Sequence, residues 1–196
     1  FRLSELAGLR RWQERWWTGG LPPLYDLKTD SQRVAWMDSY LRTILERDIP
    51  SLGIRVPPAR LRRFWKMLVS VHGRILNVSS LSRSLEVSTN AISNYLDILE
   101  GALLIRRLQP YHANIKKRLV KSPKLYIRDT GMLHRLAELT SETMLETWAG
   151  RGASFEGLLV EEIIADAQNT LPQPECLFFR TQAGAEVDLL VLSGND

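Results

Sequence analysis

The order of elements between residues 59 and 128 constrains the fold more than any other feature of this sequence. Hydrophobic periodicity there predicts three helices followed by a two-stranded hairpin. The predicted helices span Ala59–His72, Ser79–Leu85 and Ser88–Glu100, and the predicted strands span Leu103–Leu108 and Lys124–Ile127. Ser88 is a good N-cap for the third helix, and Gly73 and Gly101 fit helix ends.

This order is that of a winged helix-turn-helix, so DNA is a predicted partner. In such folds the third helix enters the major groove and the hairpin follows the phosphates. We expect the groove-facing residues to be Ser88, Thr89, Asn90, Ser93 and Asn94, and the phosphate contacts to be Lys116, Lys117, Arg118 and Lys121. The alternative is a protein-interaction module, in which the polar helix face is merely solvated and the basic triplet is a soluble loop tip.

Charge is distributed unevenly along the chain, although its net charge is only +4. Residues 1–135 hold 24 of the 26 Lys and Arg and 11 of the 22 Asp and Glu, a net of +13. Residues 136–196 hold Arg151 and Arg180 against 11 acidic residues, a net of −9. The basic part suits a polyanion, whereas the acidic part would repel one unless metal ions intervene.

The composition argues against a membrane, disulfide-rich or zinc-binding protein. No apolar run reaches membrane-spanning length, and the N-terminus lacks a signal-peptide pattern. The single cysteine, Cys176, excludes an internal disulfide and fits a reducing compartment, so we expect a cytoplasmic location and no membrane partner. The three histidines lie too far apart in sequence for zinc-type spacing.

The rest of the chain divides into a helical N-terminal part and an acidic C-terminal part. Predicted helices cover Leu3–Trp17, Ser31–Asp48 (ended by Pro50), Thr130–Leu139 and Ser154–Asn169, with a linker at Thr140–Gly152 and a hairpin of Leu177–Arg180 and Glu186–Leu192. We predict three domains. Residues 1–57 form a helical linker, residues 58–135 form the winged helix-turn-helix, and residues 136–196 form the acidic C-terminal domain.

Five short motifs occur in a fixed order. They are Gly19–Pro22, Tyr40–Ile49, Pro123–Gly131, Ser154–Gly157, and Phe179–Thr181 with Gly184–Asp188. The series resembles the C-terminal half of prokaryotic AAA+-type ATPases that carry a C-terminal domain of unknown function. The resemblance covers nearly the whole chain. It implies an α+β, mainly helical fold: a winged helix-turn-helix followed by a truncated restriction-endonuclease-like α/β segment of the PD-(D/E)xK type.

The same resemblance implies a P-loop ATPase domain ahead of these residues. The chain itself has no G-x-x-x-x-G-K-[ST] sequence that would cradle a nucleotide phosphate. It begins at Phe1 without methionine and stops at Asp196 just after a strand-like run, so both ends look like cuts through a larger protein. We therefore expect no cofactor in this chain, and ATP and magnesium in the parent protein, with the missing ATPase domain as a partner.

The resemblance also maps a nuclease-like site onto two carboxylates. Glu156 matches the helical acid and Asp188 the strand acid, and such acids hold magnesium ions that activate a water. Glu186 points to the same strand face as Asp188 and is either an extra acid or a salt-bridge partner. No Glu-x-Lys follows Asp188, so the site is incomplete and the chain is not expected to be an active enzyme.

Three functions therefore remain open. The first is a regulatory DNA-binding module of an AAA+-type ATPase, the second a magnesium-dependent nuclease domain, and the third an interaction scaffold that does not bind DNA.

Trp12 and Trp16 are four residues apart and share a helix face. Without an ATPase domain to cover them they would leave an exposed apolar patch, which predicts self-association.

Overall fold

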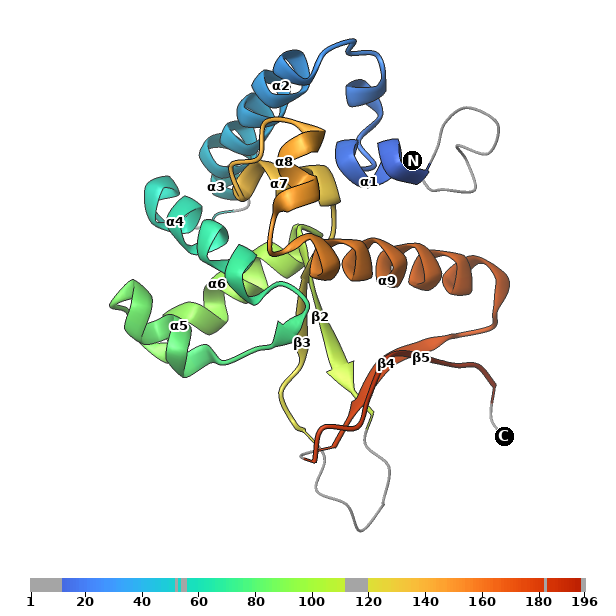
Figure 1. Ribbon diagram of the computed structural model, residues 1–196. Coiled ribbons are helices and arrows are strands. Elements are labelled where there is room, and N and C mark those ends of the chain that lie inside the picture. The colour runs from blue at the N-terminus through green and yellow to red at the C-terminus, as the bar shows by residue number, and fades with distance from the viewer. Residues whose placement is uncertain (1–11, 52, 54–55, 112–119, 182, 195–196) are drawn as a thin grey trace.

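A five-stranded sheet connects the winged-helix segment with the C-terminal segment (Figure 1). The computed structural model describes residues 12–51, 53, 56–111, 120–181 and 183–194. The strands are β1 (Arg74–Ile75), β2 (Ile105–Pro110), β3 (Lys124–Ile127), β4 (Glu175–Arg180) and β5 (Glu186–Leu192), in the order β1-β3-β2-β4-β5. β2 runs antiparallel to β3 and parallel to β4, and β4 runs antiparallel to β5. The sheet therefore crosses the predicted domain boundary at residue 135.

The N-terminal helices lie at one end of the molecule, beside α7 (Thr130–Leu136) and α8 (Glu142–Thr147) (Figure 1), and share one hydrophobic core with the winged-helix segment. They are α1 (Trp12–Thr18), the 3-10 helix η1 (Pro22–Tyr25), α2 (Asp30–Thr43), the π-helix η2 (Ile44–Asp48) and α3 (Ile49–Ser51). The predicted helix from Leu3 is described only from Trp12 onward.

The second predicted helix differs from the structure at both ends. Thr29, not Ser31, is the N-cap of α2, and it forms a capping box with Gln32. Pro50 does not end the helical run, which continues to Ser51. A proline ring clashes with the carbonyl four residues earlier in a regular α-helix. The π-helical turn before Pro50, in which the Ile49 N–H reaches back to the Ile44 carbonyl, relieves this clash.

The predicted winged-helix elements are all present. α4 (Pro58–Leu68), the 3-10 turn η3 (Val69–Val71), α5 (Val78–Leu85) and α6 (Thr89–Gly101) precede the antiparallel pair β2–β3. Asn77 and Ser88 cap α5 and α6 by accepting hydrogen bonds from backbone N–H groups. The helices meet over a core that includes Phe64, Trp65 and Leu96, each at most 1% exposed. The hydrophobic periodicity of the sequence was enough to predict these helices, because the apolar face of each helix is the face that is buried.

The C-terminal segment packs directly against the hairpin strands. It contains α7 (Thr130–Leu136), α8 (Glu142–Thr147) and α9 (Arg151–Thr170), of which α8 lies in the stretch predicted as a linker. α9 lies across the sheet in Figure 1. A second hydrophobic cluster joins α9 to β2, β3 and β4 through Leu108, Tyr126, Val160, Ile164 and Phe178. One helix and the β4–β5 hairpin do not define a restriction-endonuclease-like fold, and that assignment stays a prediction.

Within the described ranges, no helix combines the length and the apolar character that crossing a membrane requires.

Candidate functional site

The exposed face of α6 carries the residues predicted to face a DNA groove. Ser88 Oγ accepts a hydrogen bond from the Ala91 N–H at 3.1 Å, which fixes the start of the helix. One side of α6 is buried, at Ile92, Tyr95, Leu96, Ile98 and Leu99. On the other side Thr89, Asn90, Ser93 and Asn94 are exposed, and their side chains form no hydrogen bond with any other described residue. These four side chains are available to a partner.

The hairpin between β2 and β3 is held at its base by β4. Lys116, Lys117 and Arg118 lie outside the described residues, whereas Lys121 is described and exposed. The Tyr111 N–H donates to the Phe178 carbonyl at 2.6 Å, and the Val120 N–H donates to the Arg180 carbonyl at 3.1 Å. Both ends of the segment that carries the basic triplet are therefore fixed to the same strand of the C-terminal hairpin.

The two predicted site acids do come together, and they meet at a lysine to which the sequence assigned no role. Lys124 Nζ, on β3, lies 3.3 Å from Glu156 Oε1 and 2.7 Å from Asp188 Oδ1. It also lies 2.6 Å from Glu186 Oε1, and Glu186 pairs in addition with Arg180 at 3.1 Å. Glu186 is thus a salt-bridge partner, one of the two roles predicted for it.

Burial and the neighbouring carboxylates together set the protonation of the two donors in this carboxylate–lysine cluster (Lys124, Tyr126, Glu156, Glu186 and Asp188). The Lys124 side chain is 3% exposed. Burial alone lowers the pKa of Lys124, but hydrogen bonds to Asp188 and Glu186, together with the charge of Glu156, raise it above its ordinary value overall. Burial also raises the pKa of Tyr126, whose hydroxyl donates to Glu156 at 2.5 Å. At neutral pH the cluster therefore contains a charged ammonium and a neutral phenol, both donating to carboxylates.

This arrangement does not fit a magnesium ion between Glu156 and Asp188. The Lys124 ammonium takes the position between the carboxylates that a cation would need. Among the described residues, no group of three His, Cys, Asp or Glu is placed to hold a metal ion. The cluster links β3, α9 and β5 electrostatically, with the lysine as its central cation.

Sequence reasoning missed Lys124 and Tyr126, although one signal was present. Lys124 begins the short apolar strand Lys124–Ile127, every residue of which is buried. Lysine is almost never fully buried without a partner. A lysine at such a position therefore indicates carboxylates elsewhere in the fold, but it does not say which ones.

A second ionic group ties α9 to the same two strands. Glu161, 9% exposed, accepts two hydrogen bonds from Arg106, at 2.5 and 3.0 Å, and a third from Arg128 at 2.9 Å. Arg106 belongs to β2, and Arg128 directly follows β3. Because both carboxylate oxygens are engaged, this group orients α9 on the hairpin strands.

Two of the quoted motifs meet where α1 ends and α7 begins. Asp129 is the N-cap of α7 and accepts from the Met132 N–H at 2.8 Å. It also accepts from the Gly20 N–H at 2.6 Å. Gly131 is packed so closely against the Thr18 carbonyl that a Cβ there would overlap it. These motif residues therefore hold the N-terminal helices on the rest of the fold.

The Ser154–Gly157 motif has the same kind of structural role at the start of α9. Ser154 Oγ lies 2.7 Å from His134 Nε2 and accepts from Trp16 Nε1 at 3.0 Å. Ser154 is fully buried, so it is not accessible as a nucleophile. Gly157 leaves room for the His72 ring.

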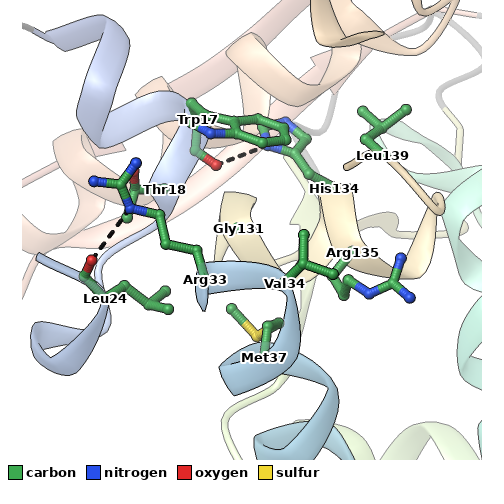
Figure 2. A pocket seen from close by; sticks show the side chains of 10 residues that line it. All are labelled: Trp17, Thr18, Leu24, Arg33, Val34, Met37, Gly131, His134, Arg135 and Leu139. Carbon is green, nitrogen blue, oxygen red and sulfur yellow. Dashed lines mark hydrogen bonds between the residues drawn. The ribbon is translucent and has the colours of Figure 1, made fainter. Parts of the chain in front are cut away.

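A small cavity between α1, η1, α2 and α7 is too small for a nucleotide. Figure 2 shows the side chains around it, with the Trp17 carbonyl bonded to His134 and the Leu24 carbonyl bonded to Arg33. Its volume is about 30 Å³. That is room for a water molecule and not for a base or a phosphate.

Comparison with known proteins identifies the family. The fold is that of a winged helix-turn-helix joined to a helix and a β-hairpin. The chain belongs to the family described as "Domain of unknown function (DUF8612)", whose model matches residues 9–143. Residues 151–196 match a second model, "Domain of unknown function (DUF4143)".

Two mycobacterial proteins are close relatives. The uncharacterized proteins Mb2031c of Mycobacterium bovis and Rv2008c of Mycobacterium tuberculosis are each 45% identical over 181 residues, which is 91% of this chain and 40% of theirs. The chain thus spans less than half the length of these relatives. A solved structure, that of the transcriptional regulator PA3341, overlaps 71% of this chain and 98% of its own with 19% identity and a TM-score of 0.28. An overlap this loose gives no basis for a functional assignment.

Proposed function

We propose that this chain binds duplex DNA through α6 and the β2–β3 hairpin. The observation that carries the proposal is the exposed polar face of α6, on which Thr89, Asn90, Ser93 and Asn94 have no intramolecular hydrogen-bond partner in the described chain. Asparagine side chains can bond to the N6 and N7 atoms of adenine in the major groove. Ser88 is the N-cap of α6 and is itself exposed.

The hairpin supplies the sequence-independent part of the proposed contact. Lys116, Lys117, Arg118 and Lys121 would contact phosphates. The backbone bonds from Tyr111 and Val120 to β4 support this role, because they hold both ends of the basic segment to a rigid sheet.

Fluorescence anisotropy with a labelled duplex across a salt series tests the proposal. We expect Asn90→Ala with Asn94→Ala to weaken binding to a preferred sequence by about 1–3 kcal/mol for each adenine that an asparagine reads. Alanine at Lys116, Lys117 and Arg118 should lower the salt dependence of binding instead. Gln168→Ala with Asn169→Ala, which removes two exposed amides at the end of α9, is the matched control. The proposal fails if the wild type does not bind at low salt, or if the α6 variant binds like the control.

We propose further that the DNA-binding module serves an AAA+-type ATPase domain elsewhere in the parent protein. The motif series in the sequence supports this, and the mycobacterial relatives are long enough to carry such a domain. ATP and magnesium would then act in that part of the protein. ATP hydrolysis by the full-length protein, abolished when a lysine of its P-loop is replaced, is the test.

A magnesium-dependent nuclease is the second candidate function, because Glu156, Asp188 and a lysine do converge. It would require Lys124 to leave the position between the carboxylates. Gel analysis of the same duplex after incubation with magnesium decides it. Cleavage that disappears in Glu156→Gln would favour the nuclease, and intact DNA would remove it.

A further inference from the structure

α4 presents a cationic surface that the proposed α6 contact does not use. Its 11 residues include Arg60, Arg62, Arg63 and Lys66 and no acidic residue. The opposite side of the helix is buried in the core, at Leu61, Phe64, Trp65 and Leu68. All four cations therefore project on the solvent side of one helix.

Three adjoining hollows extend this surface beyond α4, and Lys66 lines each of them. The first, about 420 Å³, is also lined by Arg62 and Arg63. The second, about 50 Å³, lies between α4 and α7 and brings Arg62 near Arg135. The third, about 610 Å³, reaches Arg74 and the start of α9. Arg62, Arg63 and Arg74 thus line hollows that all share Lys66, and Arg60 lies one turn before Arg63 on the same helix.

The acids that line these hollows are already neutralised. Asp38 accepts two hydrogen bonds from Arg135, at 2.7 and 3.1 Å, and Glu138 accepts one from Lys66 at 2.6 Å. Arg60, Arg62, Arg63 and Arg74 form no ion pair with any carboxylate in the described part of the chain. Like charges on neighbouring turns of a helix repel each other, so an external anion would lower the free energy of this surface.

We propose that the α4 band, defined as Arg60, Arg62, Arg63 and Arg74, binds the phosphate backbone of duplex DNA. The inference rests on the proposed function for the identity of the partner and adds a second contact surface to it. Arginine suits phosphate because its planar guanidinium donates two parallel hydrogen bonds. A membrane surface fits less well, because insertion needs large exposed apolar side chains. None of the large exposed apolar residues of the described chain lies on α4.

The test measures DNA affinity against salt for the variant Arg60→Gln, Arg62→Gln, Arg63→Gln. Each phosphate contact contributes about 0.9 to the slope of log K against log salt. We expect the slope of the triple variant to fall by about 1–3 and its affinity at low salt to fall at least tenfold. The matched control is Lys28→Gln, Arg47→Gln, Arg151→Gln, which removes the same charge from exposed residues that line none of the three hollows.

The outcomes separate this proposal from the α6 contact. A slope that falls in the α4 triple variant and not in the control supports the band, even if the α6 variant binds like wild type and the groove contact fails. Equal slopes in the triple variant and the control overturn the band while leaving the α6 contact intact. Absence of any DNA binding overturns both, and binding to polyglutamate or anionic vesicles would then show that the band takes another polyanion.

Discussion

His72 and His134 hold the first turn of α9 in their neutral forms. The His72 ring accepts the Ile127 N–H at Nδ1 and donates from Nε2 to the Ala153 carbonyl. His134 donates from Nδ1 to the Trp17 carbonyl, so its Nε2 accepts the Ser154 hydroxyl. Burial lowers the pKa of each ring to about 4. A second proton on His72 would break its bond from the Ile127 N–H, and a second proton on His134 would reverse the direction of its bond with the Ser154 hydroxyl.

At the residue scale this predicts a loss of stability in mild acid. Because the unfolded histidines titrate near their ordinary pKa, the unfolded state binds protons first as pH falls. The free energy of unfolding should be level above about pH 6.5 and should decrease from there towards pH 4, by up to about 3 kcal/mol per histidine. Urea unfolding across this range measures it. His134→Asn should show a shallower dependence, and a variant that keeps the full wild-type dependence would contradict the assignment.

At the scale of elements, one N-cap joins α7 to the N-terminal helices. Asp129 both caps α7 and bonds to the Gly20 N–H after α1, whereas Ser141 caps only the short helix α8. We expect Asp129→Ala to lower the free energy of unfolding by about 2–3 kcal/mol, the sum of a cap and a second partly buried hydrogen bond. Ser141→Ala should cost about 1 kcal/mol or less. Chemical denaturation compares the two, and equal losses would mean that the Gly20 bond contributes nothing.

At the scale of the whole molecule, the shared sheet predicts a single unfolding unit. β4 pairs with β2, and Glu161 and Lys124 connect the C-terminal segment to the hairpin strands by ion pairs. All six tryptophans lie between residues 12 and 148, whereas the single cysteine, Cys176, lies in β4. Tryptophan fluorescence therefore reports on residues 12–148 and their contacts with the start of α9, whereas thiol labelling reports on β4.

The two probes should give the same midpoint in a urea titration, because the second hydrophobic cluster combines residues of α9 and β4 with residues of β2 and β3. Labelling of Cys176 at clearly lower urea than the fluorescence change would show that the C-terminal segment unfolds on its own.

Self-association remains a separate prediction at this scale. Trp12 packs on Phe155 yet stays 48% exposed, and Leu159 and Ile163 of α9 are 40% and 47% exposed. Sedimentation at increasing concentration measures it, and a monomer throughout would remove the prediction.

The sequence alone determined the helices of the winged-helix region, the β4–β5 hairpin and the Ser88 cap. Each depends only on residues a few positions apart, so local sequence periodicity and capping residues are enough to predict it. Family resemblance also grouped Glu156 with Asp188, and the fold does bring these two acids together. The sequence did not reveal α8, the helical run through Pro50, or the lysine that lies between the two acids.

Only the tertiary structure decided what surrounds those acids. Lys124 meets Glu156 across 32 positions of sequence and Asp188 across 64, and Arg106 meets Glu161 across 55. Such contacts follow from the parallel pairing of β4 with β2 and from the packing of α9 against the sheet. No local sequence pattern encodes either arrangement. The periodicity of a single sequence indicates which face of each helix or strand is buried. Which buried charges face one another is fixed only when the elements pack, because burying an ion is favourable only where its partner is brought within a few ångströms.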